Sequence, residues 1–373
     1  MKKRRPRIYD NENYSDFAEQ PSPLEVQLGS ELMPLLDEQT DCPLLRGYHD
    51  FRNVIDAEYG LPLPTMRIRY NMILNPCEYK ILLHGTEVGG FKYLNSMQII
   101  CLDTGDLTGE LSGEKIKEPA YGLNGIIVAK EKADEAKRLG YAVTEPSDFI
   151  LGQIFEIIRK NRTKFLNQCM VNTLINKVRD TNPDVVDDVF FMHNFSTSKF
   201  KTILNWLLAE GFSIRDMNSI LEAMADNIDE TKNLVELLEK IREKLVWQLL
   251  SAIADKDKII HVIRVSKTLS KALSERIYYP QSYNELPYYT FSLAETKVFA
   301  IEMYKKAICM QKKDHLPIFV IVSNLRTALA NTIRQQLGRE WICISDKELC
   351  SVITDYSVVV EEVLEINEIK VNE

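Results

Sequence analysis

The chain has 373 residues, of which 45% are hydrophobic and 27% are charged. This is the composition of a globular protein that is long enough for two or more hydrophobic cores. The formal net charge is −8, so the overall field repels polyanions, and no broad basic surface for nucleic acid is expected. The sequence contains no run of about 18 apolar residues, so we expect the chain neither to span a membrane nor to start with a signal peptide.

The seven cysteines are odd in number and form no C-x-x-C pair. This pattern favours reduced thiols in a cytoplasmic protein over zinc binding or redox chemistry. The first seven residues include a basic run, which fits either an anionic bilayer surface or a solvated tail, and we favour the tail. We interpret residues 1 to 21 as a flexible lead-in that ends at a Pro-Ser-Pro segment.

The fold is expected to begin near Leu24 and to mix short helices with strands. The apolar spacing predicts a helix over residues 45 to 59, which Gly60 ends. Two alternating runs, residues 66–70 and 79–83, predict a β-hairpin, because a turn-like Leu-Asn-Pro segment lies between them. Further strands are expected at residues 98–102 and 126–128, and a short helix at residues 130–139. A glycine-spaced segment between those strands suggests a small β-rich insertion.

From Ser147 the apolar spacing becomes helical, with Ser147 itself as a candidate N-cap. A second helix ends at Gly211, and another is expected to start at Ser213, where Asp216 stands in the position of a capping-box acid. Residues 234–249 predict a longer amphipathic helix. The remaining part alternates between strand and helix patterns, which indicates a small α/β domain at the C-terminus: residues 259–265, 293–310, 318–322, 325–337 and 341–344.

No catalytic, cofactor or metal site is indicated by residue spacing. The five histidines are scattered, without the H-x-x-x-H or H-E-x-x-H spacing of a helical metal site. The segment 85–90 lacks the Gly-Lys-Ser/Thr ending of a phosphate loop and is better explained as a turn between strands. Residues 117–123 combine an acid, a proline and an aromatic outside any core periodicity. Such a segment suits either an interface anchor or plain loop packing, and composition alone favours packing.

Residues 213–225 resemble the "SIRD…ILE.LA" signature of the FHIPEP family, the FlhA/SctV export-gate proteins of flagella and injectisomes. The matching positions are Ser213, Ile214, Arg215, Asp216, Ile220, Leu221 and Glu222. They follow residues 204–211, which are similar to the family's "vLq.LL.Eg" segment, and residues 23–29 and 61–71 match upstream motifs in family order. The resemblance runs from about residue 22 to about 250 and more weakly to about 360.

The resemblance implies an α+β and α/β fold made of four small subdomains. The first would comprise residues 22–96 plus 146–165, split by an inserted β-rich subdomain at residues 97–145. Residues 166–250 would form a helical subdomain, and residues 251–373 a C-terminal α/β subdomain. Family members assemble as a ring of nine, so the helical subdomain is expected to contact other copies of the chain.

The implied function is a docking platform of the type III, flagellar-type export gate at the cytoplasmic face of the bacterial inner membrane. It would not be an enzyme. It would bind export chaperone–substrate complexes, other copies of itself and components of the export ATPase complex, but no nucleic acid and no cofactor. It would meet the membrane only through a domain absent from this chain. The cleft for chaperones lies between the first two subdomains and would include Glu118, Pro119, Tyr121 and Gly152.

Residues 118–123 are similar to the "DPAFGL" of flagellar members, where Glu118 keeps the charge and Tyr121 keeps the ring. Gly152 stands where the family commonly has threonine, Gln153 where histidine is usual, and Tyr70 in place of the aspartate of "IRDN". Family members carry a multi-helix membrane domain, so the chain is either an excised domain or a free-standing relative. A small-molecule-binding or enzymatic α/β protein is the alternative, and it is supported by fold pattern alone.

Overall fold

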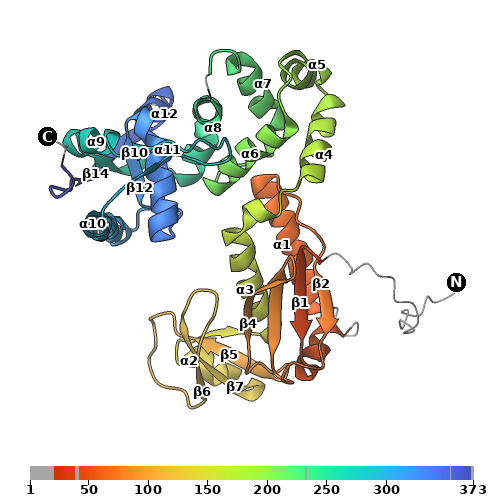
Figure 1. The fold of residues 1–373 in the computed structure, drawn as a ribbon. Coiled ribbons are helices and arrows are strands. Elements are labelled where there is room, and N and C mark those ends of the chain that lie inside the picture. The colour runs from red at the N-terminus through yellow and green to blue at the C-terminus, as the bar shows by residue number, and fades with distance from the viewer. Residues whose placement is uncertain (1–20, 38–41, 232, 353, 371–373) are drawn as a thin grey trace. The chain divides into compact units, whose positions relative to one another are not determined.

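The structure is a computed structural model that describes residues 21–37, 42–231, 233–352 and 354–370 (Figure 1). The lead-in predicted for residues 1–21, with its basic run, lies outside this part of the chain except for Pro21. The described chain divides into two compact units, Met1–Asp50 with Pro64–Arg159, and Phe51–Leu63 with Lys160–Glu373. Within the described residues, the helices all fall short of the length and apolar character needed to cross a membrane.

The first unit contains a four-stranded sheet in the order β2-β1-β3-β4. The strands are β1 (Leu24–Leu28), β2 (Arg67–Tyr70), β3 (Tyr79–Leu83) and β4 (Thr86–Phe91). The hairpin predicted between β2 and β3 is wrong, because β1 lies between them, parallel to β2 and antiparallel to β3. Alternate residues of β1 are buried. This alternation shows which face of the strand is buried, but it does not show that β1 lies between β2 and β3 in the sheet. The hairpin that does form joins β3 to β4.

Two helices accompany this sheet, α1 (Pro43–Tyr59) and α3 (Pro146–Lys160), together with a 3₁₀ turn at Ser30–Leu36. The predicted end of α1 is confirmed, since Gly60 follows with φ +68°. Helix α3 begins at Pro146, so Ser147 lies inside it and not at the N-cap. It packs on the sheet through Phe149, whose ring lies 5.3 Å from that of Phe91.

A second antiparallel sheet, ordered β6-β7-β5-β8, occupies the stretch between β4 and α3. Its strands are β5 (Gln98–Leu102), β6 (Glu114–Lys117), β7 (Asn124–Ala129) and β8 (Ala142–Thr144), and it carries α2 (Ala133–Arg138) after a 3₁₀ turn at Lys130–Lys132. A core of its own lies beneath this helix: Ile99, Cys101, Leu111, Ile126, Val128, Ala136 and Tyr141. The β-rich character predicted for this stretch is confirmed, while its standing as a separate subdomain stays a prediction.

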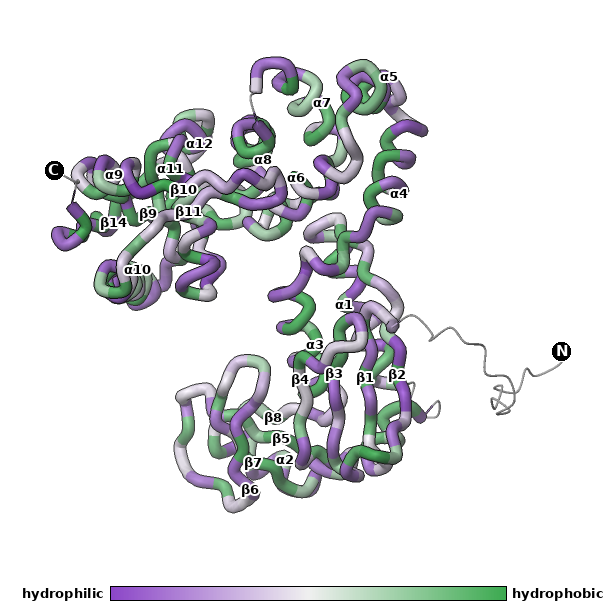
Figure 2. The backbone as a smooth tube through the Cα atoms, viewed as in Figure 1, coloured by the Kyte–Doolittle hydropathy of each residue, from purple (hydrophilic) through white to green (hydrophobic). Residues whose placement is uncertain are grey.

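The second unit begins with helices, most of which carry hydrophobic and hydrophilic residues along the same element (Figure 2). They are α4 (Gln168–Arg179), α5 (Pro183–Asp187), α6 (Thr197–Ala209), α7 (Met217–Asn227) and α8 (Leu234–Ile253), with short turns at Arg162–Lys164 and Asp188–Met192. The predicted start of α7 at Ser213 is wrong. Asp216 is its N-cap and accepts hydrogen bonds from the backbone N–H and the hydroxyl of Ser219. The short carboxylate therefore caps the helix directly.

A parallel sheet in the order β13-β12-β9-β14 completes the second unit. Its strands are β9 (Ile259–Val265), β12 (Ile318–Ile321), β13 (Ile342–Ser345) and β14 (Ser357–Leu364). Its helices are α9 (Lys267–Ser274), α10 (Leu293–Gln311), α11 (Ser323–Thr332) and α12 (Asp346–Ser351). The same region contains a helical turn at Ile333–Leu337 and a separate two-stranded sheet of β10 (Ile277–Tyr278) and β11 (Tyr288–Tyr289). Apolar cores cover both faces, as parallel sheets require. The α/β prediction for this region is confirmed, although α9, α12 and β14 were not expected. The four-subdomain division stays a prediction.

Candidate functional site

Residues 118–123, called the docking turn here, connect β6 to β7. The backbone N–H of Glu118 donates to the carbonyl of Leu123 at 2.8 Å, and the N–H of Gly122 donates to the carbonyl of Glu118 at 3.0 Å. Gly122 has φ +74°, a left-handed conformation that costs glycine little. The turn is therefore closed by its own backbone.

Glu118 is buried, with 4% of its surface exposed. Its carboxylate accepts hydrogen bonds from the backbone N–H of Ala120 at 2.7 Å and of Tyr121 at 2.6 Å. Charge-assisted bonds of this kind are among the stronger hydrogen bonds in proteins. The acid expected to face a partner thus points into the turn and fixes the backbone that carries Tyr121.

Tyr121 is 67% exposed, in contrast to the acid three residues before it. Its amide is held by Glu118, and Pro119 fixes a backbone dihedral between the two. A large ring on a restrained backbone can be buried against a partner at a small conformational cost. The turn therefore presents one aromatic side chain to solvent in a defined position.

The turn lies close to α3 and the first sheet through Tyr79. The Tyr79 hydroxyl, on β3, donates to Oε1 of Gln153 on α3 at 2.7 Å, in a buried setting. Burial raises the pKa of Tyr79, and the negative charge of Glu118 raises it further. Glu118, Tyr79 and Gln153 are thus brought together although they are distant in sequence. Gly152 precedes Gln153 on α3, and a Cβ at this position would meet no atom within 4 Å.

The signature residues 213–217 hold the C-terminal end of α1 within the second unit. The backbone N–H of Ile214 donates to the carbonyl of Tyr59 at 2.8 Å, and Nη1 of Arg215 donates to the carbonyl of Ala57 at 3.3 Å. A Cβ on Gly60 would lie 2.5 Å from Cα of Arg215. The glycine thus permits a close backbone approach. Ile220 and Leu221 are buried on α7, so the signature has a structural explanation.

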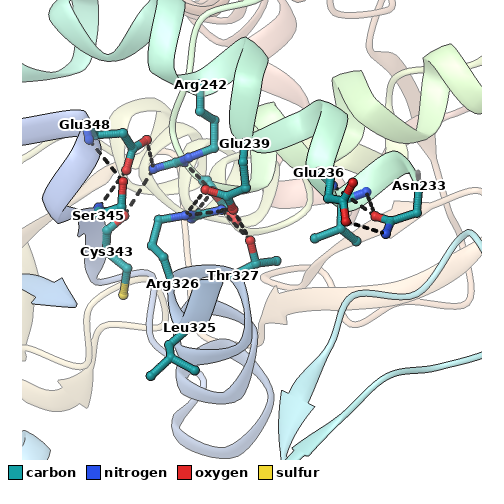
Figure 3. Close-up of polar contacts among 12 residues, drawn as sticks. Asn233, Glu236, Glu239, Arg242, Leu325, Arg326, Thr327, Cys343, Ser345 and Glu348 are labelled. Atoms are coloured by element: carbon teal, nitrogen blue, oxygen red, sulfur yellow. Dashed lines mark hydrogen bonds and ion pairs between the residues drawn. The ribbon is translucent and has the colours of Figure 1, made fainter. Parts of the chain in front are cut away.

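A buried ionic cluster in the second unit was not predicted from the sequence. Its members are Glu210, Glu239, Arg242, Arg326 and Glu348. Figure 3 shows Glu239 and Arg242 extending from one helix toward Arg326 and Glu348. Arg326 pairs with Glu210 at 2.7 Å and also contacts Glu239. Arg242 pairs with Glu348 at 2.9 Å and also contacts Glu210.

The guanidinium groups of the ionic cluster are almost wholly buried, since the side chains of Arg326 and Arg242 are 0% and 1% exposed. Burial on its own raises the pKa of Glu210, but the charges of Arg326 and Arg242 more than offset it and hold that pKa below its ordinary value. Glu348 also closes the capping box of α12 with Ser345. The cluster therefore joins α6, α8, α11 and α12 through three acids and two arginines, and Arg334, 4.0 Å from Glu210, supplies a third positive charge.

One sequence signal pointed to the ionic cluster. Arg242 stands four residues after Leu238 and three before Leu245, which places it within the apolar stripe of α8. A charge on a buried helix face requires a partner. The identity of that partner could not be read locally, because Glu210 and Glu348 lie on other elements.

A pocket of about 670 Å³ lies beside the N-terminal end of α8. Its volume is in the range of small-ligand sites. Tyr279 and Tyr283 belong to its lining, together with Glu239. The carboxylate of Glu239 is already engaged by Arg326 and by the hydroxyl of Thr327. Glu239 is therefore already paired within the ionic cluster.

Comparison with known proteins agrees with the sequence resemblance. The profile of the FHIPEP family matches residues 2–354. The flagellar biosynthesis protein FlhA of Treponema pallidum is 30% identical over 311 residues, which are 83% of this chain and 43% of that protein. The FlhA protein of Helicobacter pylori is 27% identical over 84% of this chain and 42% of its own length. The chain thus spans less than half the length of these relatives.

Solved structures show the same fold. The Chlamydia pneumoniae CdsV protein, in its complex with CdsO, superimposes with a TM-score of 0.77 at 17% identity, covering 95% of this chain and all of the other. The nonameric EPEC SctV-C gives a TM-score of 0.72 at 17% identity over 93% of this chain and 99% of the other. The mixed α+β architecture is therefore that of known SctV domains, and the family match over nearly the whole sequence shows that this chain belongs to the FHIPEP family.

Proposed function

We propose that the chain is a cytoplasmic docking platform of the type III, flagellar-type protein export gate, with the docking turn as its contact for export chaperone–substrate complexes. The proposal places it at the cytoplasmic face of the bacterial inner membrane, as a transport component and not an enzyme. Family membership supports the export role. The names of the relatives, flagellar biosynthesis proteins, support the flagellar branch.

The observation that carries the docking site is the contrast between Glu118 and Tyr121. The acid is buried and holds the turn, whereas the ring is two-thirds exposed on the backbone that the acid fixes. Aromatic side chains of this kind are frequent hot spots at protein interfaces. Under this proposal Glu118 and Pro119 position Tyr121, and only Tyr121 is buried by the partner.

Gly152 and Gln153 contribute to the proposed site through α3. Gln153 anchors Tyr79, which lies next to the Glu118 charge. Gly152 leaves open space where a larger residue would stand. We infer that the surface offered to a partner at Gly152 is smaller and less polar than the surface of the threonine common in the family. Tyr121 would then contribute a larger share of the binding free energy.

A ring of copies is the second part of the proposal. EPEC SctV-C is nonameric, and two large apolar side chains of the helical region, Phe191 and Met192, are 79% and 73% exposed. Exposed apolar groups on a soluble surface often mark interaction sites. We propose that residues 166–250, with Phe191 and Met192, contact a neighbouring copy in a heterologous, ring-closing interface. CdsV forms a complex with CdsO, which supports further protein partners for this fold, and we propose components of the export ATPase complex among them.

The docking proposal is tested by Tyr121→Ala, measured by calorimetric titration with an export chaperone–substrate complex. Loss of a true anchor should reduce the binding free energy by about 2 kcal/mol or more, which is on the order of 30-fold in Kd. The thermal melt should change little, because the ring makes few contacts to lose. Tyr279→Ala is the matched control, since Tyr279 is 66% exposed and lies in the other unit.

Two results would contradict the docking assignment. Tyr121→Ala with unchanged affinity and a lowered melting temperature would show that the ring supports the fold. An equal loss of affinity in Tyr279→Ala would show that any exposed tyrosine has the same effect, so that the docking turn has no special role.

A further inference from the structure

We propose that His261, His315 and Glu361 form a binding site for a divalent transition-metal ion of the Zn²⁺ class in the C-terminal part of the chain. His261 lies on β9, Glu361 on the neighbouring strand β14, and His315 in the segment between α10 and β12. Sequence spacing could not find them, because His261 and Glu361 are 100 positions apart. The site belongs to the second unit, whereas the docking turn belongs to the first, and the proposed export function does not depend on it.

The three side chains already converge. One ligand atom from each lies within 4.8 Å of the other two. Nδ1 of His261 is 2.9 Å from Oε1 of Glu361, close to the separation of two ligands on a tetrahedral zinc ion, which is about 3.3 Å for bonds of 2.0–2.1 Å. The His261 and His315 rings are stacked with centroids 3.7 Å apart and planes 9° apart. Binding by both rings requires His315 to turn out of this stack, because a metal ion lies in the plane of each imidazole that binds it.

The backbone supports this convergence at Glu361. The pairing of β14 with β9 shifts register between Val360 and Glu362, so Glu361 is the extra residue of a β-bulge. Bulges redirect a side chain and are frequent near functional sites. Val359 pairs with His261, so Glu361, two residues further on, projects from the same face of the sheet as His261. Its carboxylate faces that ring.

Asp255 supplies the outer partner that metal-bound histidines usually have. Its Oδ2 lies 3.4 Å from Nε2 of His261, the ring nitrogen opposite the one that faces Glu361. The carboxylate is itself held, because Oδ1 accepts hydrogen bonds from the backbone N–H groups of Asp257 at 2.9 Å and Ile259 at 2.7 Å. A carboxylate on the second ring nitrogen fixes the tautomer and strengthens the histidine as a ligand.

Two imidazoles and one carboxylate are the ligand set of several three-residue zinc sites, with a water in the fourth position. Imidazole ligands favour Zn²⁺, Ni²⁺ and Cu²⁺ over Ca²⁺ and Mg²⁺, which prefer oxygen ligands. The site is partly exposed, since the side chains of His261 and Glu361 are each 17% exposed, so an ion can enter from solvent. Lys313 pairs with the other carboxylate oxygen of Glu361 at 2.6 Å. The ion pair between Lys313 and Glu361 must weaken when the metal binds to this carboxylate.

The test is calorimetric titration of the full chain with Zn²⁺ under reducing conditions, followed by X-ray absorption of the bound metal. We expect saturable 1:1 binding with nitrogen and oxygen neighbours only. His315→Gln should weaken binding on the order of 100-fold or more, because it removes a direct ligand. Asp255→Asn should weaken it by about 10- to 100-fold, the range for outer partners. The thermal melt should rise with Zn²⁺ in the parent chain and not in His315→Gln.

The matched control is His193→Gln. His193 also has two carboxylate partners, Asp188 at 3.3 Å and Asp229 at 3.2 Å. Among the described residues it is not part of a group of three side chains that could hold a metal ion. Its loss should leave the Zn²⁺ affinity unchanged. Sulfur neighbours in the absorption spectrum would overturn the proposal, because cysteine thiolates would then hold the metal. Absence of saturable binding, or equal affinity in His315→Gln, would overturn it as well.

Discussion

Replacement of Glu210 by alanine tests whether the ionic cluster is charge-compensated. Glu210 faces both Arg326 and Arg242, whose side chains are essentially unexposed. Removing its carboxylate takes one buried acidic partner away from each of these two guanidinium groups. Breaking a buried pair in this way destabilises proteins by about 3–5 kcal/mol.

The expected magnitude lies at the lower end of that range. After the change, Arg326 keeps Glu239 and Arg242 keeps Glu348. Each guanidinium is therefore left with one partner and not stranded. We expect a loss of about 3 kcal/mol in the free energy of unfolding of the second unit. For a body of roughly 150–250 residues, this corresponds to about 6–12 °C in melting temperature.

The assay is urea unfolding followed by tryptophan fluorescence. The three tryptophans of the chain, Trp206, Trp247 and Trp341, all belong to the second unit, so the signal reports on the unit that holds the ionic cluster. Glu243→Ala is the matched control, because Glu243 pairs with Lys240 at 3.6 Å on a solvent-exposed part of α8. Such surface pairs contribute about 0–1 kcal/mol.

The double change Glu210→Ala with Arg242→Met also takes the arginine partner from Glu348, whose side chain is 0% exposed, and should lower the stability further. If Glu210→Ala lay within 1 kcal/mol of Glu243→Ala, the reasoning from buried charge would be refuted. The same holds if the double variant were as stable as Glu210→Ala.

Three further predictions follow from named groups. The folded-state pKa of Glu210 is depressed, so its contribution to stability should be complete above the unfolded pKa of about 4.3 and be lost as pH falls through the lower folded pKa. Glu210→Gln should remove this part of the pH dependence of the urea midpoint. An unchanged pH dependence would contradict the prediction. Gly152→Ala should stabilise the first unit by about 0.5–1 kcal/mol in denaturation followed by circular dichroism, because the position is helical and a Cβ meets open space; destabilisation would show that the space is not open. Burial raises the pKa of Cys343 to about 12, so alkylation read by mass spectrometry should label the exposed Cys169 and Cys350 well before it, and early labelling of Cys343 would contradict its burial.

Local pattern predicted much of the secondary structure. The glycine that ends α1 and the apolar stripe of α8 were recognisable because a helix end and an amphipathic face leave their mark within a few residues. The family signature at residues 213–217 was equally visible. The start of α7 was misplaced, because Ser213 and Asp216 are both good N-caps and only the hydrogen bonds to Ser219 distinguish them.

Only the tertiary structure reveals the order of the strands in each sheet. β2 and β3 are neighbours in sequence, yet β1 separates them in the sheet. Alternation reports which side of a strand is buried and says nothing of which strand lies next to it. For the same reason β14, which begins after α12, was not recognised as the partner of β9.

For the docking turn, the sequence by itself determined the residue types, which are an acid, a proline and an aromatic. It also determined the resemblance to the family in which this combination occurs. Only the tertiary structure decided that Glu118 is buried against its own backbone while Tyr121 remains exposed. The ionic cluster and the His261, His315 and Glu361 group also became visible only in the fold. The physical reason is that charge pairing and ligand convergence depend on distances in space, whereas sequence patterns record only neighbours along one helix or strand.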